Sequence, residues 1–204
     1  MAVDPQNVGL EAIGIAVDNG ELVFSEESKG MNFDRACDHV IVLLRDAVSC
    51  FERGSYGTAV FLAITAIEEI AKAEVGLYRR EKSIKPTKRG KDKLFNHSAK
   101  HQMAILPTVF MGKRLEEALG AERCQQLLEE AANGEFRSLR EDSLYFRNSN
   151  GQFVTPTDSI SKSKAREMLL LAIEAGDDRL VGYTGHTGLV EQQLSDLFGA
   201  IQNS

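Results

Sequence analysis

The feature that most constrains this 204-residue chain is a pair of long amphipathic stretches separated by one short break at Gly54. Residues 34–53 repeat apolar side chains at steps of three and four, as one face of an α-helix does. Residues 55–80 show the same spacing. Because so short a break leaves the chain room only to reverse its direction, the two stretches predict an antiparallel helical hairpin.

The rest of the chain predicts further helices and two small β excursions. Helical spacing is expected over 94–106, 113–132, 163–175 and 188–202, and the first of these stops before Pro107. Residues 13–24 alternate around Asn19-Gly20, which is typical of a β-hairpin, and residues 143–159 contain β-prone patches around Asn150-Gly151 that favour a small hairpin or an ordered loop. The predicted fold class is mainly α, a helical bundle with one or two small β-hairpins.

Composition and charge limit the classes of function. The chain has 43% hydrophobic and 26% charged residues, and it contains no apolar run long enough to span a membrane. Its N-terminus lacks the pattern of a secretory signal, so we expect a cytoplasmic protein with no membrane partner. Cys37, Cys50 and Cys124 have no metal-binding spacing, which predicts reduced thiols and excludes a zinc ribbon.

One segment reverses the overall charge of −6. Residues 79–93 hold eight basic side chains against two acidic ones, and Pro86 and Gly90 predict a loop. The segment is either a solvated connector or an arm that follows RNA phosphates. It lacks aromatic partners, so we expect any RNA binding there to be nonspecific. The candidate RNA-binding residues are Arg79, Arg80, Lys85, Lys88 and Arg89.

Glu68 is the anomaly of the second long helix, because it falls inside the apolar arc. An ionised carboxylate buried without partners costs several kcal/mol, so its counter-charges must come from nearby. Lys72 is the nearest at i+4, and the helix at 94–106 supplies His97 and Lys100 on one face together with His101. We therefore expect Glu68, Lys72, His97 and Lys100 to meet in one polar cluster. The cluster is either a buried network that fixes helix register or a chemical site.

Three motifs carry a resemblance to a known family. They are EExxK (Glu68, Glu69, Lys72), HxxK (His97, Lys100) and RxxxLY (Arg140, Leu144, Tyr145). In their order and spacing, roughly over residues 35–175, the chain resembles the AbiV-type abortive-infection family of the HEPN superfamily. The resemblance implies a bacterial phage-defence protein that acts on RNA or the translation machinery, or that engages a phage protein. It also implies a HEPN-like bundle over residues 31–204 that forms homodimers through the helical hairpin, with residues 1–30 as an extension.

The resemblance also marks the candidate site. Its polar positions fall on Glu68, Glu69, Lys72, His97, Lys100, Arg140 and Tyr145. Active HEPN ribonucleases pair an arginine with a histidine that follows it after four to six intervening residues, and here only Arg179 and His186 satisfy the wider spacing, with His186 in a turn. The catalytic hypothesis is a metal-independent ribonuclease that uses His97, Lys100 and Arg140 together with Glu68 and Lys72.

Two alternatives remain open. His97 and His101 have the helical spacing of a zinc pair with Glu68 as a third ligand, but Ser98 stands where a metalloprotease needs its glutamate, so no metal or other cofactor is expected. The second alternative is a noncatalytic module that binds a phage or translation protein. A ribonuclease requires His97 to be accessible in a cleft shared with the basic loop, whereas a scaffold allows it to be sealed between helices.

Overall fold

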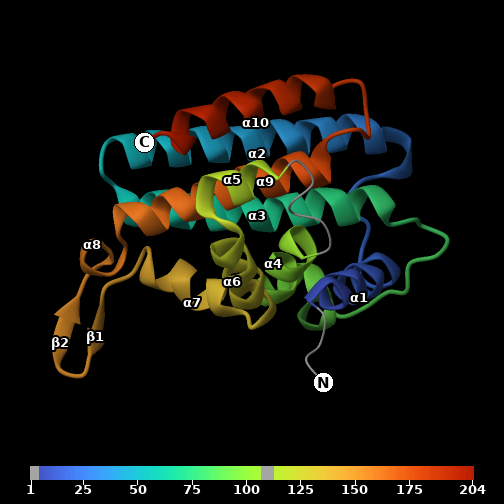
Figure 1. Ribbon diagram of the computed structural model, residues 1–204. Helices are drawn as coiled ribbons and strands as arrows, with labels where there is room; N and C mark the ends of the chain where they lie inside the picture. Colours follow the sequence, from blue (N-terminus) through green and yellow to red (C-terminus); the bar gives the residue numbers. More distant parts are fainter. Residues whose placement is uncertain (1–4, 107–112) are drawn as a thin grey trace.

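A computed structural model describes residues 5–106 and 113–204 and confirms the helical bundle. Its upper layer holds four long helices that run side by side (Figure 1). They are α2 (Lys29–Glu52), α3 (Tyr56–Tyr78), α9 (Lys162–Leu180) and α10 (Thr187–Gln202). The expected hairpin is the α2–α3 pair, and Gly54 lies between the two helices with φ 81°. Such a left-handed conformation suits glycine because a side chain would strain it.

The central helix, α3, is covered on two sides. The helices α2 and α9 pack against one side of it, and α4 (His97–Ile105) and α7 (Glu135–Asp142) pack against the other. This arrangement explains why α3 buries residues around most of its circumference, including Ile64, Ile67 and Val75. A polar residue on the side toward α4 is therefore inside the protein and needs partners there.

The lower layer of shorter helices beneath α3 differs in detail from expectation. It contains α1 (Pro5–Asp18), α4, α6 (Ala121–Ala132) and α7, while α5 (Arg114–Leu119) precedes α6. The helix expected over 113–132 is divided at Gly120, whose φ is 86°. The helix expected over 94–106 begins only at His97, because Asn96 caps it by accepting a hydrogen bond from the Ala99 amide. Pro107 lies outside the described residues.

The prediction of a β-hairpin over residues 13–24 is wrong. The first part of that stretch belongs to α1, whose buried Ala12 and Ala16 lie four residues apart on one helical face. Gly20 does not turn a hairpin: its amide donates to the carbonyl of Lys85, and the Lys85 amide donates to the carbonyl of Asp18. The N-terminal segment thus pairs with the basic loop and not with itself.

The second β excursion is confirmed as a hairpin that extends away from the bundle (Figure 1). The strands β1 (Arg147–Ser149) and β2 (Gln152–Val154) are antiparallel, with Asn148 opposite Phe153. Asn150 and Gly151 form the turn with positive φ angles. The hairpin is followed by the short helix α8 (Pro156–Ser159).

The three cysteines lie in the core. Cys37, Cys50 and Cys124 are buried free thiols. Burial raises the pKa of Cys37 to about 12 and that of Cys124 to about 11, so neither is a ready nucleophile. Within residues 5–106 and 113–204, no helix is both long and apolar enough to cross a membrane.

Candidate functional site

The carboxylate of Glu68 collects polar side chains from α4, as the sequence predicts. Glu68 is only 4% exposed on the side of α3 that faces α4. Its Oε2 accepts a hydrogen bond from Lys100 Nζ at 2.5 Å. Its Oε1 lies 2.8 Å from His97 Nδ1 and 3.2 Å from His101 Nε2. The three partners come from one face of α4 because they lie at spacings of three and four residues.

A fourth partner, Arg140, reaches the carboxylate from α7. Its Nε lies 3.5 Å from Glu68 Oε1, and its guanidinium carbon lies 4.6 Å from the centre of the Phe61 ring. The ring and the carboxylate thus hold the arginine from two sides. We call these five polar residues the Glu68 cluster: Glu68, His97, Lys100, His101 and Arg140.

The cluster fixes the charge of its central carboxylate. Burial acts to raise the pKa of Glu68, but hydrogen bonds from His101 and Lys100 and the charge of Lys100 outweigh it and lower this pKa to about 2. Burial lowers the pKa of His101, which favours its neutral form. Because an ionised carboxylate can only accept hydrogen bonds, His97 must carry a proton on Nδ1 and His101 a proton on Nε2.

His97 connects this buried cluster with solvent. Its side chain is 42% exposed, in contrast to the buried His101. It lines an open cleft, here called the His97 cleft, together with Lys72, Arg89, Leu94, Phe95 and Lys100. Since Nδ1 is engaged with Glu68, Nε2 is the ring nitrogen left for a ligand in the cleft. The histidine therefore lies in a cleft shared with the basic loop.

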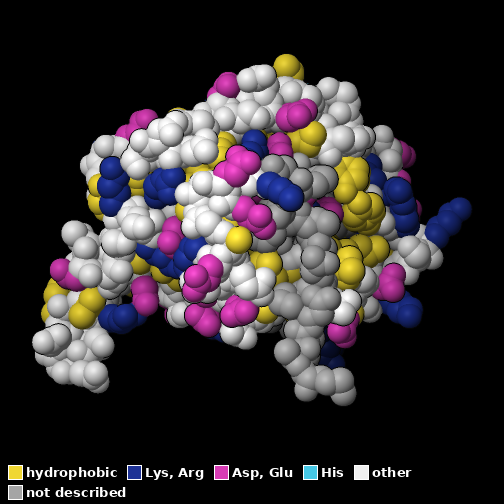
Figure 2. All heavy atoms as spheres, in the orientation of Figure 1, with side chains coloured by type: hydrophobic (Ala, Val, Ile, Leu, Met, Phe, Trp, Pro, Cys, Tyr) yellow, Lys and Arg dark blue, Asp and Glu magenta, His cyan; other side chains and the backbone are white. Residues whose placement is uncertain are grey.

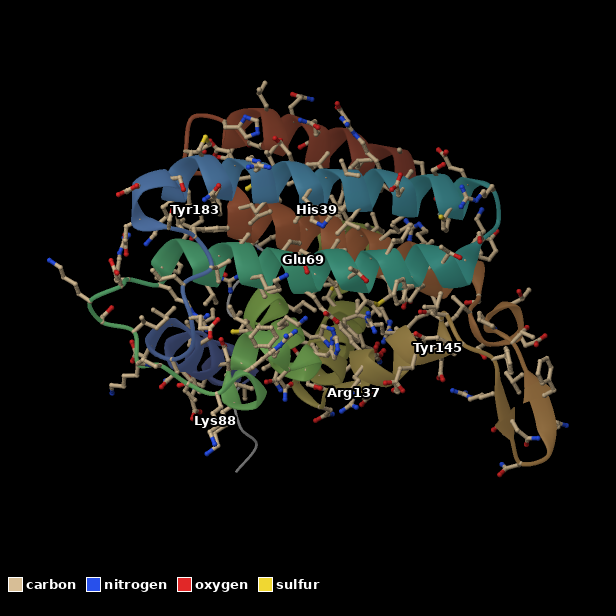
Figure 3. The ribbon with its side chains drawn as sticks, turned by 180° about the vertical axis from the view of Figure 1, so that it is seen from behind. His39, Glu69, Lys88, Arg137, Tyr145 and Tyr183 are labelled. Atoms are coloured by element: carbon tan, nitrogen blue, oxygen red, sulfur yellow. The ribbon has the colours of Figure 1, made fainter. Side chains whose placement is uncertain are left out.

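Lys72 does not join the Glu68 cluster, and the expected contact between Lys72 and Glu68 is wrong. Its ammonium bonds both carboxylate oxygens of Glu69, at 2.7 and 2.9 Å. Figure 3 shows Glu69 midway along α3, on the outer side of the helix above α4. Lys72 instead contributes to the wall of the His97 cleft.

Arg79 is not an exposed member of the basic loop, so the structure removes it from the candidate RNA-binding residues. It is 1% exposed, and its guanidinium donates to the carbonyls of Ala16, Asn19 and Glu21. It also pairs with Asp92 at 2.7 Å. The arginine thus ties the N-terminal segment to the end of the loop.

The other basic candidates are exposed but differ in position. Arg80 lies 3.7 Å from Glu26, while Arg89 stacks on Phe95 in the His97 cleft. Lys85 and Lys88 are exposed along the loop, and Figure 3 shows Lys88 beside α1. Only Arg89 of this group lines the His97 cleft.

Tyr145 and the Arg179–His186 pair lie outside the Glu68 cluster. Tyr145 is exposed where the chain leaves α7 for the β-hairpin (Figure 3). Arg179 is buried against Glu74 at 3.2 Å, whereas His186 bonds Asp38 at 2.7 Å. The arginine and the histidine therefore have separate partners and do not form the paired site that their spacing suggests.

The metal alternative gains no support from the geometry. His97 and His101 do meet Glu68, but through hydrogen bonds. In the part of the chain that the structure describes, no group of three or more histidine, cysteine, aspartate or glutamate side chains is arranged to hold a metal ion.

Three residues of this region were not proposed from the sequence as catalytic or RNA-binding residues, although His101 was named as a neighbour of Glu68 and as a zinc ligand of the metal alternative. His101 is signalled by its i, i+4 spacing from His97, and the pattern alone places it in the cluster. Phe95 follows the basic loop by two residues and supplies the aromatic side chain that the loop itself lacks. Phe61, which holds Arg140, gave no signal beyond its place on α3.

Comparison with known proteins gives one match. The family model of the AbiV proteins of HEPN type matches residues 33–176, which is more than half of the chain and contains every residue of the Glu68 cluster. Neither the curated proteins nor the solved structures give a match.

Proposed function

The chain belongs to the AbiV family of HEPN proteins, which indicates a role in abortive-infection phage defence, and from this premise we propose that it cleaves RNA in the His97 cleft without a metal ion. The observation that carries the proposal is the position of His97. One of its ring nitrogens is held by an ionised buried carboxylate, and its side chain is exposed in a cleft with basic walls. A carboxylate that bonds one ring nitrogen of a histidine fixes its tautomer and the orientation of its ring.

The proposed cleavage uses Nε2 of His97, the ring nitrogen that is not bonded to Glu68. His97 Nε2 removes the proton from a ribose 2′-hydroxyl, and the 2′-oxygen attacks the adjacent phosphorus. The bond from phosphorus to the 5′-oxygen then breaks, and that oxygen leaves with a proton taken from water. The products are a 2′,3′-cyclic phosphate and a 5′-hydroxyl end. Lys72 and Arg89, which line the cleft, stabilise the additional negative charge on the phosphorane.

Lys100 and Arg140 have a different role in this proposal from the one expected from the sequence. Both are engaged with Glu68, and Lys100 is buried. They keep the carboxylate ionised so that it can hold His97, and they act as positioning residues. Lys72 and Arg89 replace them as the cations that meet phosphate.

The test is cleavage of labelled RNA in EDTA by the wild-type protein and by His97→Ala. The control is His39→Ala, because His39 is exposed on α2, which lies in the layer away from α4 (Figure 3). We expect the loss of cleavage in His97→Ala alone, with both variants as well folded as the wild type by circular dichroism. Equal cleavage by His97→Ala would overturn the proposal.

A second candidate function is a noncatalytic module that engages a phage or translation protein, and the β-hairpin favours it. Tyr145, Phe146 and Phe153 are all exposed there, and the last two rings lie 5.2 Å apart. Figure 2 shows hydrophobic side chains on this projection. Exposed apolar groups gathered in one place are typical of protein-binding surfaces. Retention of a phage or ribosomal protein by the wild type but not by a Phe146→Ser, Phe153→Ser variant would support this function.

We also propose that the protein acts in the cytoplasm, where its RNA would be, as a homodimer that pairs through the α2–α3 hairpin. The outer side of α2 carries exposed Met31 and Val42, which a second copy would cover. Sedimentation of the wild type and of a Val42→Glu variant tests the assembly. A monomeric wild type would refute it.

A further inference from the structure

The His97 cleft contains an exposed aromatic ring. Basic side chains bind the phosphates of any nucleic acid, whereas an aromatic ring can also stack on a base. Phe95 is 51% exposed and lies between the basic loop and His97. The guanidinium carbon of Arg89 lies 4.4 Å from the centre of the Phe95 ring. A planar cation over an aromatic ring makes a flat, electropositive surface that extends beyond the ring itself.

We propose that Phe95 and Arg89 form a stacking site for one unpaired nucleobase, so that the His97 cleft selects single-stranded RNA over duplex RNA. This inference rests on the proposed binding of RNA in the cleft, and it adds the class of RNA. A base in a duplex has both faces covered by its neighbours, whereas an unpaired base offers a face to an aromatic ring or to a guanidinium.

The stacking site is held in place by its surroundings. Phe95 ends the 3₁₀ turn Lys93–Phe95, and Asp92 begins that turn by accepting a hydrogen bond from the Leu94 amide at 2.9 Å. Asp92 is itself buried and paired with Arg79. On the other side, Asn96 caps α4 directly after Phe95. Anchors on both sides keep the ring beside His97, which reduces the entropy lost when a base stacks on it.

The charges in the cleft suit the sugar–phosphate chain of such a base. Arg89 belongs to the exposed basic loop with Lys85 and Lys88, and Lys72 and His97 line the same cleft as Phe95. Figure 2 shows Lys and Arg side chains extending from the end of the molecule where this loop lies. A base on Phe95 would therefore bring its own phosphate into the cleft that His97 lines, where the proposed cleavage takes place.

The test measures binding separately from cleavage. The probe is a short oligouridine with 2′-O-methyl groups and one 2-aminopurine, because it lacks the 2′-hydroxyl nucleophile and reports stacking as a fall in fluorescence. Its affinity is measured for the wild type, Phe95→Leu, Arg89→Lys and Phe153→Leu. Phe153 is the matched control, because it is also an exposed ring but lies on the β-hairpin.

We expect Phe95→Leu to weaken binding about tenfold and to abolish the fall in fluorescence, since stacking on an aromatic residue contributes on the order of 1–3 kcal/mol per base. Arg89→Lys keeps the charge and should weaken binding less, while Phe153→Leu should leave it unchanged. A duplex of the same sequence should bind weakly and equally to all four proteins.

The outcomes separate this inference from the proposed function. Wild-type affinity and quenching in Phe95→Leu would overturn the stacking site and leave the ribonuclease proposal standing. Phe95-dependent binding by a protein that cleaves no RNA would support the stacking site and refute the ribonuclease. The absence of any RNA binding by the wild type would refute both.

Discussion

Two glutamates on the same helix, Glu68 and Glu74, are almost equally buried and yet have opposite ionisation behaviour. Glu68 is 4% exposed and has a pKa lowered to about 2, whereas Glu74 is 3% exposed and has a pKa raised to about 7. They lie six residues apart on α3 and face different neighbours. Glu68 meets α4 and α7, while Glu74 meets Arg179 of α9.

The difference follows from the number of hydrogen bonds that each carboxylate receives. Glu68 accepts three from α4, and these hydrogen bonds together with the charge of Lys100 outweigh its burial. Glu74 bonds Arg179 through Oε1, and its Oε2 has no hydrogen-bond partner among the described residues. Burial and the nearby charge of Asp178 raise the pKa of Glu74 against the effect of Arg179. Burial alone therefore does not decide the charge of a carboxylate; the hydrogen-bond donors and the charges around it also count.

The comparison also separates a candidate site from a structural pair. The Glu68 cluster opens to solvent through His97, so its fixed negative charge can act on a ligand. Glu74 and Arg179 are both buried, and the pKa of the nearby Tyr183 is raised by burial, by its hydrogen bond with Tyr78 and by the charge of Glu74. Their pairing joins α3 to α9.

The largest expected effect is that of Glu68→Gln on stability at neutral pH. The substitution leaves the buried Lys100 and the Arg140 cation without their counter-charge, so we expect a loss of about 3 kcal/mol in the free energy of unfolding. Urea denaturation measures it, with Glu69→Gln as the control because that residue pairs with the partly exposed Lys72. The control should lose no more than about 0.5 kcal/mol. Equal losses would contradict the central position of Glu68.

The stability that each glutamate contributes should change with pH in opposite directions. The lowered pKa of Glu68 contributes stability that is complete above its ordinary value of 4.5 and is lost as pH falls toward 2. The raised pKa of Glu74 contributes stability that is complete below 4.5 and is lost as pH rises through about 7.

Urea midpoints measured across this range for the wild type, Glu68→Gln and Glu74→Gln test these signs. The difference curve of Glu74→Gln excludes the effect of His101, whose lowered pKa also reduces stability on acidification, whereas that of Glu68→Gln includes it because His101 bonds Glu68. Glu74→Gln should remove a decline between pH 4.5 and 7, and Glu68→Gln should reduce the decline below 4.5. A Glu74→Gln curve parallel to the wild type would show that folding does not raise the pKa of Glu74.

At neutral pH the effect of Glu74→Gln should be smaller than that of Glu68→Gln. Glu74 is partly protonated there, so a neutral amide of the same shape replaces a group that is already neutral in part of the molecules. We expect a loss of about 1 kcal/mol, from the weaker hydrogen bond to Arg179. Thermal and urea unfolding measure it. A loss as large as that of Glu68→Gln would remove the contrast between the two sites.

The smallest expected effect is that of His186→Ala. His186 pairs with Asp38 at the surface, and this contact raises the pKa of the histidine. The loss of a surface ion pair should cost about 0.5 kcal/mol or less, and RNA cleavage should be unchanged because His186 and Arg179 do not meet. Cleavage lost in His186→Ala but kept in His97→Ala would transfer the active site to the Arg179–His186 pair.

The sequence predicted most of the fold because the long helices carry a clear period. The α2–α3 hairpin and the partners of Glu68 on α4 follow from side chains at steps of three and four, which place them on one face. Short elements were harder to predict. The helix α1 was missed because its buried face uses the small residues Ala12 and Ala16, so the alternating Ile13, Ile15 and Val17 dominated the pattern.

The errors at the site came from contacts that no local spacing encodes. Lys72 is four residues from Glu68, but it lies at the edge of the buried face, and its ammonium bonds the carboxylate of Glu69. Arg79 belongs by sequence to a basic run, yet its partners are backbone carbonyls of the N-terminal segment. Carbonyl partners leave no trace in side-chain patterns, so only the tertiary structure shows that Arg79 is buried.

The measurement that tests the central claim most directly is the tautomeric state of the two α4 histidines, read from the nitrogen chemical shifts of their rings in alkaline buffer. The claim is that ionised Glu68 accepts from both, at His97 Nδ1 and at His101 Nε2. We predict opposite tautomers, with the proton of His97 on Nδ1 and that of His101 on Nε2. His97 protonated on Nε2 would contradict the account, because no nitrogen would then be free to take a proton in the cleft.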